Sequence, residues 1–133
     1  FGGVSGHAGL FSNAYEIGVL MEMVMNKGII NDKRFIRAST VELFSKYQSD
    51  ISRRGYGYDK PEKDNASRKV PYPSMSVSAD AFGHTGFTGT CAWADPEKNI
   101  VFVLLANRVH PTAKNTFGDL NVRGKVMEEV FVR

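Results

Sequence analysis

The sequence contains a single cysteine, Cys91, among its 133 residues, and this scarcity excludes an internal disulfide bond. Cys91 lies within an apolar segment, so we expect it to be a small buried hydrophobic residue. The three histidines, His7, His84 and His110, lie in separate segments, and no spacing among them is typical of a metal site. The sequence therefore predicts neither a disulfide framework nor a bound metal or other cofactor.

Long apolar runs and clusters of one charge are also missing. No apolar stretch reaches the length that crosses a membrane, and no signal-peptide pattern is present. The net charge is only +3, and the basic residues are scattered without interleaved aromatics. These features predict a globular domain with no transmembrane segment and argue against a nucleic-acid partner. Because the first residue is Phe1, we expect the chain to be a piece of a longer protein.

What is present is the length and the order of elements of one α+β domain, residues 1–133. A helical part is expected over residues 1–54 and a variable loop over residues 55–81. An antiparallel sheet with a C-terminal helix is expected over residues 82–133. There are no internal repeats.

Two helices are expected in the first part. Ser12 can cap a helix whose apolar residues include Ile17 and Val24, and Gly28 is a natural stop for it. A second helix is expected to begin at Ser39, where Ser-Thr-Val-Glu has the pattern of a capping box. Both helices would present one apolar face to the core.

The segment after the helices is less regular. The stretch "GYGYDK" at residues 55–60 favours a short strand. About twenty polar residues without periodicity follow, which is unusual inside a compact domain. They indicate either a surface loop or insertion, or a mobile linker.

The last part has the strongest strand pattern. Two apolar runs, "TGTCAWAD" and "NIVFVLLANRV", flank the turn "DPEKN", so residues 82–109 are expected to form an antiparallel meander. The second run is apolar on both faces, which predicts that both faces are covered. A C-terminal helix is expected to pack on the sheet through Leu120, Val126, Met127, Val130 and Phe131.

The stretch "FGHTGFTGT", residues 82–90, combines three glycines, three threonines and one histidine at the start of this meander. Glycine weakens a strand interior unless a backbone or a ligand must approach closely. The stretch is therefore expected to be a sharp hairpin and also the lip of a binding site.

The stretch, the two strands, "NRVHPT" and the terminal helix together resemble the C-terminal part of the serine β-lactamase and penicillin-binding-protein superfamily. The class C-related branch, which includes esterases and peptidases, is the most similar, and the glycine-rich opening "GGVSGHAGLFS" also resembles it. A Lys-Thr-Gly triplet lies beside the active site in that superfamily, and many members carry His-Thr-Gly instead. The resemblance implies a partial β-lactamase-like fold.

Four residues are implicated by this resemblance: His84, Thr85, Gly86 and Phe87. It implies that Gly86 lets a substrate backbone lie close and that Phe87 offers an amide to the oxyanion hole. His84 and Thr85 would offer side-chain donors to a substrate carboxylate or to the catalytic hydrogen-bond network. Histidine holds no fixed positive charge near pH 7, in contrast to lysine, which leaves ester or peptide substrates open beside β-lactams.

The superfamily's nucleophile motif, Ser-x-x-Lys, is absent from the sequence, and so is Tyr-x-Asn or Ser-x-Asn. Both motifs precede the triplet in the superfamily. The resemblance therefore implies a fragment of a serine hydrolase that acts in acyl transfer on a β-lactam, ester or peptide substrate. The 133 residues alone are predicted to be inactive, and the missing N-terminal part is predicted to supply the nucleophile.

Two alternatives come from other classes. The chain could be a non-catalytic β-lactamase-like module that binds peptidoglycan-like or glycan partners in a cell-envelope protein, or a complete small α+β interaction domain. The favoured reading predicts a small-molecule or peptidoglycan-like substrate and a location in the bacterial periplasm or cell envelope. It also predicts self-association of the fragment through an exposed sheet edge.

The other two histidines receive structural predictions. His7, in "SGHAGLF", is expected to tie backbone groups together in a tight turn, and a place on the rim of the cleft is the alternative. His110 precedes a proline and is expected to fix the chain after the last strand.

Overall fold

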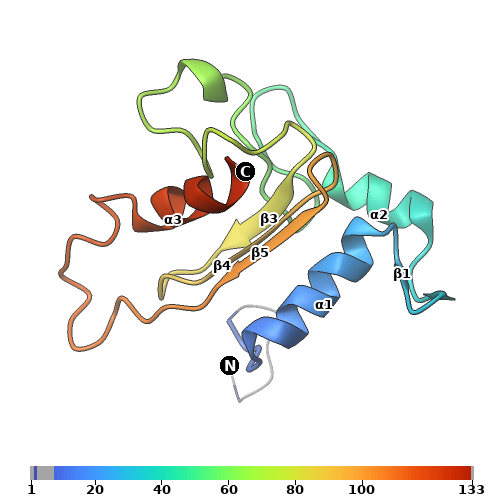
Figure 1. The fold of residues 1–133 in the computed structure, drawn as a ribbon, viewed down its shortest axis with the longest axis horizontal. Coiled ribbons are helices and arrows are strands. Elements are labelled where there is room, and N and C mark those ends of the chain that lie inside the picture. Colours follow the sequence, from blue (N-terminus) through green and yellow to red (C-terminus); the bar gives the residue numbers. More distant parts are fainter. Residues whose placement is uncertain (1, 3–7, 133) are drawn as a thin grey trace.

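The computed structural model of the protein defines residue 2 and residues 8–132. Strands β3 (Phe82–Thr85), β4 (Cys91–Asp95) and β5 (Ile100–Leu104) form an antiparallel sheet in the order β3-β4-β5. Helix α1 (Ala14–Met25) covers one face of this sheet and α3 (Val122–Phe131) covers the other (Figure 1). The α+β class, the meander and the coverage of both faces are confirmed.

The turn between β4 and β5 is built as its sequence predicts. The Asp95 carboxylate accepts hydrogen bonds from the Glu97 and Lys98 amides at 3.1 and 3.2 Å, and Asn99 takes a left-handed backbone with φ of 55°. Asparagine tolerates this region better than most residues. The strands are shorter than the apolar runs, because β5 ends at Leu104 and β4 begins only at Cys91.

Side chains of the sheet alternate between two apolar clusters, as the two-residue period of a strand requires. The cluster on the α3 side contains Trp93, which is fully buried, and Phe102. Tyr72 meets Trp93 edge-on, with 5.7 Å between ring centroids. The cluster on the α1 side contains Met21, Val24, Val41, Phe82 and Ala94.

Both predicted helix caps are wrong by one or two residues. Asn13 caps α1, since its side-chain oxygen accepts from the Glu16 amide at 3.0 Å, while the Ser12 hydroxyl donates to the Glu16 carboxylate. Helix α2 (Ala38–Ser45) follows Arg37, whose carbonyl already accepts from two amides of the first turn. Ser39 therefore lies inside the helix. Asparagine and serine are comparable caps, so the pattern alone did not fix the start.

A short β-hairpin joins α1 to α2, and its two strands have two residues each. The sequence did not predict it. Strands β1 (Ile29–Ile30) and β2 (Lys33–Arg34) pair across Asn31 and Asp32, which both have positive φ. Gly28, the predicted stop of the first helix, lies just before it with φ of 85°. A Cβ on Gly28 would lie 2.2 Å from a backbone oxygen, so glycine is required there.

Helix α3 is shorter than predicted, and of the predicted apolar residues only Met127 and Phe131 are buried. It buries Gly124, Met127 and Phe131, which follow the three- and four-residue spacing of one helix face, whereas Val126 and Val130 stay exposed. Leu120 lies before the helix and is also exposed. Among the described residues, no helix is long and apolar enough to cross a membrane.

Residues 55–81 contain one short 3₁₀ helix, η1 (Asn65–Ser67), and pack against the sheet and α3. The short strand expected near residues 55–60 is reduced to isolated bridges from Asp59 to Arg54 and Gly83. Ser74 donates to the Glu128 carboxylate of α3 at 2.5 Å, and the same carboxylate accepts further hydrogen bonds from residues 75 and 76. Burial alone would raise the pKa of Glu128, but these hydrogen bonds outweigh burial and hold the pKa below its ordinary value.

Candidate functional site

The His-Thr-Gly stretch ends β3 and turns sharply into β4. The Gly86 amide donates to the Thr90 carbonyl at 2.8 Å, and the Gly89 amide donates back to the Gly86 carbonyl at 3.1 Å. Gly89 has φ of 106°, which favours glycine. A Cβ on Gly86 would lie 2.3 Å from the Thr90 hydroxyl oxygen. The predicted hairpin is therefore present, and its glycines have a steric reason.

A cleft of about 850 Å³ opens beside this hairpin. Phe87 does not line the cleft, because it lies at the hairpin tip with 75% of its surface exposed. The fold thus brings three of the four predicted site residues together and places the fourth beside them. The walls are formed by residues 10–12, Ile17, His84, Thr85, Gly86, residues 90–92 and residues 105–107.

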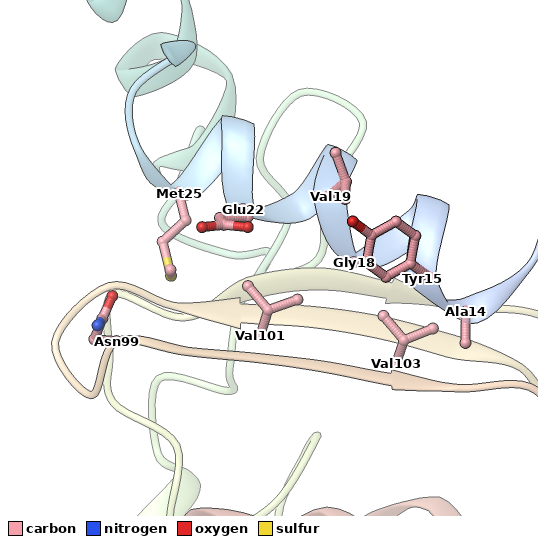
Figure 2. A pocket seen from close by; sticks show the side chains of 9 residues that line it. All are labelled: Ala14, Tyr15, Gly18, Val19, Glu22, Met25, Asn99, Val101 and Val103. Atoms are coloured by element: carbon pink, nitrogen blue, oxygen red, sulfur yellow. The ribbon is translucent and has the colours of Figure 1, made fainter. Parts of the chain in front are cut away.

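A second groove of about 540 Å³ runs between α1 and the sheet. Figure 2 shows Tyr15 and Glu22 of α1 lying over Val101 and Val103 of β5 in this groove. Glu22 is its only ionisable side chain besides the Tyr15 phenol, and the groove does not include the His-Thr-Gly stretch. The cleft beside β3 is therefore the better candidate for chemistry.

Both ring nitrogens of His84 have protein partners. Nδ1 lies 2.8 Å from the Thr85 carbonyl oxygen, and Nε2 lies 2.9 Å from Nη1 of Arg54. An arginine can only donate, so Nε2 accepts and Nδ1 donates, which defines a neutral imidazole of fixed tautomer. In this arrangement the ring has no nitrogen left for a ligand.

Asp59 is the buried charge behind His84, with only 1% of its surface exposed. Its carboxylate lies 2.6 Å from Nη1 of Arg54 and 3.5 Å from Nη2 of Arg53, and it accepts a hydrogen bond from the Tyr72 hydroxyl at 2.5 Å. Burial, together with this hydrogen bond, raises the pKa of Tyr72, so the phenol stays protonated and donates. The hydrogen bond goes to Oδ2 alone, and Oδ1 is held by the ion pair with Arg54 without a hydrogen-bond partner among the described residues.

Backbone hydrogen bonds hold Asp59 against β3. Its amide donates to the Gly83 carbonyl at 2.7 Å, and the Gly83 amide donates to the Asp59 carbonyl at 3.0 Å. A Cβ on Gly83 would lie 2.2 Å from the Ala92 carbonyl oxygen. Arg54 and Asp59 were not among the predicted site residues. The available signal was the charged residues that flank the glycine-tyrosine turn in "SRRGYGYDK".

Two further arginines fix the hairpin tip from outside. Nε of Arg108 donates to the Phe87 carbonyl at 2.6 Å, and its guanidinium lies 4.5 Å from the Phe87 ring centroid. Nη1 of Arg123 donates to the Gly86 carbonyl at 2.8 Å. Within the described ranges, the Phe87 amide has no hydrogen-bond acceptor. The tip therefore combines a free donor with positive charge, which favours anionic groups.

Cys91 is buried, as predicted, and forms part of the cleft wall. Burial raises the pKa of its thiol to about 11, so the group is a thiol at neutral pH and a poor nucleophile. The part of the chain that the structure describes contains no group of three His, Cys, Asp or Glu side chains that could hold a metal. His110 is exposed and does not line the cleft, and His7 lies outside the described residues.

Comparisons with known proteins agree on one family. The family profile described as "Beta-lactamase" matches residues 2–125. A "Putative D-alanyl-D-alanine carboxypeptidase" of Escherichia coli K12 is 38% identical over 109 residues, which cover 82% of this chain and 24% of that protein. A protein of the same description from Salmonella enteritidis is 36% identical over 121 residues, which cover 91% of this chain and 27% of that protein. The chain thus spans about a quarter of the length of these relatives.

Proposed function

Because the chain belongs to the β-lactamase family, we propose that it supplies one wall of the active site of a serine hydrolase. The observation that carries the proposal is the end of β3, where His84, Thr85 and Gly86 line the cleft. Beyond the bridge at Gly83, no strand among the described residues pairs with the outer edge of β3. A substrate backbone can therefore lie along this edge and form hydrogen bonds with it.

The reaction that we propose is acyl transfer from a peptide, ester or β-lactam carbonyl. The names of the relatives favour peptides that end in D-alanyl-D-alanine, and we carry that substrate over as part of the proposal. Phe87 does not itself line the cleft, but its amide directly follows Gly86, which does, and we assign this amide to the developing oxyanion because such a hole needs backbone amides that are not otherwise paired. We also propose a location in the periplasm or cell envelope, which substrates of this kind would require.

The nucleophile is assigned to a part of the protein outside these 133 residues. No serine of the chain is followed by lysine three positions later, and the only cysteine is buried. Acyl transfer by the family mechanism needs an activated nucleophile. The chain alone is therefore inactive in our proposal and acts only with the remainder of its protein.

The test is hydrolysis by the full-length protein that contains this chain, with acetyl-D-alanyl-D-alanine, a chromogenic ester and a chromogenic β-lactam as substrates. Turnover of at least one substrate by the full-length protein, and of none by the 133-residue chain, is the expected result. Turnover by the chain alone would refute the assignment of the nucleophile. A full-length protein that binds peptidoglycan without any turnover would instead establish the non-catalytic module.

A further inference from the structure

The hairpin tip between β3 and β4 is held through its carbonyl groups. The Gly86 carbonyl accepts hydrogen bonds from the Gly89 amide at 3.1 Å and from Nη1 of Arg123 at 2.8 Å. The Phe87 carbonyl accepts from Nε of Arg108 at 2.6 Å. The Phe87 amide, by contrast, has no acceptor among the described residues. The tip is therefore anchored through its acceptors, and this donor stays available.

The Gly86 carbonyl and the Phe87 amide belong to one peptide unit. A peptide unit is planar and, when no proline follows, trans, so its C=O and N–H bonds point in opposite directions. The groups that hold the carbonyl therefore also set the direction of the amide. Because glycine has little intrinsic preference among backbone conformations, this unit depends on such contacts for a fixed direction.

Arg123 reaches the tip from α3, which lies on the opposite face of the sheet from α1 (Figure 1). The cleft lies on the α1 side, since its walls include Ile17 of α1 and residues 10–12 before that helix. A carbonyl that is held towards α3 directs the amide of the same peptide unit away from α3. That direction is the side on which the cleft opens.

The helix itself does not explain why an arginine occupies this position. Arg123 is the second residue of α3, where the positive end of the helix dipole opposes a cation. Its half-buried guanidinium lies 5.8 Å from the Phe117 ring centroid. Among the described residues, its hydrogen bonds go to two hairpin carbonyls, Gly86 at 2.8 Å and Thr90 at 3.4 Å. These contacts with the hairpin offset the unfavourable place of the charge.

We propose that Arg123 is a positioning residue, which holds the Gly86 carbonyl so that the Phe87 amide faces the developing oxyanion. The inference rests on the proposed function, since it assumes acyl transfer at this cleft. A donor that is oriented before the reaction needs no reorganisation when the charge develops. The charged hydrogen bond also polarises the peptide unit, which makes its amide a stronger donor. Arg123 does not line the cleft, so its role is indirect.

The experiment replaces the reacting carbonyl oxygen of the substrate by sulfur, which is a weaker hydrogen-bond acceptor. The pairs are para-nitrophenyl acetate with its thionoester, and acetyl-D-alanyl-D-alanine with its thioamide. The full-length protein is compared with its Arg123→Met and Arg123→Lys variants, by kcat and KM on every substrate that it turns over. Lys125→Met is the matched control, because it removes an exposed positive charge from the same helix. Circular dichroism and the Tm establish that each variant is folded.

The expected result for Arg123→Met is a roughly ten- to hundredfold lower kcat with a KM that changes less than about twofold, because the amide acts in the transition state. The preference for oxygen over sulfur should shrink in the same variant. Arg123→Lys keeps a charged donor and should recover part of kcat. Lys125→Met should match the wild type. An arginine that only stabilised the hairpin would lower the Tm and leave the oxygen-to-sulfur preference unchanged.

An unchanged kcat or an unchanged preference in folded Arg123→Met would overturn the role of Arg123 and leave the proposed function intact. If Arg123→Met does not fold, Arg123→Lys decides the same comparison. A wild type that turns over the oxygen and sulfur compounds equally well would overturn the role without any variant. No turnover of any substrate by the full-length protein would instead refute the proposed function, and this inference with it.

Discussion

The two outer edges of the three-stranded sheet differ in almost every respect. The β3 edge is bridged by a buried aspartate and surrounded by arginines, whereas the β5 edge consists of Ile100–Leu104, without a charged residue. Among the described residues, no strand pairs with the β5 edge, and α1 forms a groove beside it. The same backbone arrangement therefore supports a polar site on one side and an apolar packing surface on the other.

The two edges also differ in the free-energy cost of their buried charged groups. Placing Asp59 and Lys60 in the interior beside β3 carries a desolvation penalty that the β5 edge does not bear. The Lys60 ammonium donates to the Asp80 carbonyl at 2.8 Å, which offsets part of this penalty. Charged groups with such penalties often gather at functional sites, so the β3 edge is where stability and function are most tightly linked.

The largest loss of stability is expected from Asp59→Ala, which removes the buried carboxylate that pairs with Arg53 and Arg54 beside β3. Removing one member of a buried ion-pair network typically costs about 3–5 kcal/mol, because the remaining charges lose their partner. Urea unfolding of the 133-residue chain measures this loss. Asp64→Ala, which removes an exposed carboxylate paired with Arg68, is the control and should leave stability close to the wild-type value. Equal effects of the two variants would contradict the central role of Asp59.

A second effect concerns the pH dependence of stability at the same edge. Burial lowers the pKa of Lys60 to about 8 from its ordinary value of 10.5. Between these values the unfolded state binds more protons than the folded state, so stability rises with pH. From about pH 7.5 to 9.5 Lys60 contributes a gain of roughly 2 kcal/mol, and the raised pKa of Cys91 offsets part of it at the upper end of this range. Urea unfolding at several pH values should show this rise, and Lys60→Met should remove it. A rise that persists in Lys60→Met would have another cause.

The effect on activity is expected from His84→Ala in the full-length protein. Loss of the imidazole removes a side chain from the cleft wall and one contact of Arg54, and misplacement of groups around the substrate lowers kcat/KM by roughly ten- to hundredfold. The Tm should stay close to the wild-type value, because His84 is exposed. His110→Ala, outside the cleft, should leave both quantities unchanged. Unchanged turnover in His84→Ala would remove this residue from the site.

The smallest effect is expected at the β5 edge. We propose that the 133-residue chain self-associates through this uncharged edge, and a lysine there opposes edge-to-edge pairing. Val103→Lys should weaken self-association about tenfold, which corresponds to roughly 1.4 kcal/mol. Sedimentation velocity over a range of concentrations measures it. Val130→Lys on α3 adds the same charge elsewhere, and an equal effect there would assign the change to net charge.

The sequence predicted the elements with strong local signals. Two apolar runs on either side of a turn predicted the meander, and the asparagine of "DPEKN" adopts the left-handed conformation that the turn requires. Helix ends were predicted less well, because Asn13 and Ser12 are both competent caps and only the tertiary path selects one. The same limit applies to α3, where the predicted apolar residues exceed what one face can bury.

The candidate site was predicted only in part, because a sequence pattern identifies local neighbours but not residues that meet through the tertiary fold. His84, Thr85 and Gly86 follow one another on a strand, so a local pattern could identify them. Arg54 contacts His84 across 30 positions of sequence and Asp59 pairs with Gly83 across 24, and no local periodicity indicates such contacts. A single sequence gives little indication that a charged loop residue is buried, which is why Asp59 was missed.

The bridge between Asp59 and Gly83 limits what the β3 edge can accept. It uses the outward amide and carbonyl of Gly83, so an incoming backbone can pair only with the residues after it. The hairpin turn begins at Gly86, which leaves a short segment between two fixed boundaries. If the proposed function holds, we therefore expect the edge to accept the end of a polypeptide rather than its middle, which is the difference between an exopeptidase and an endopeptidase.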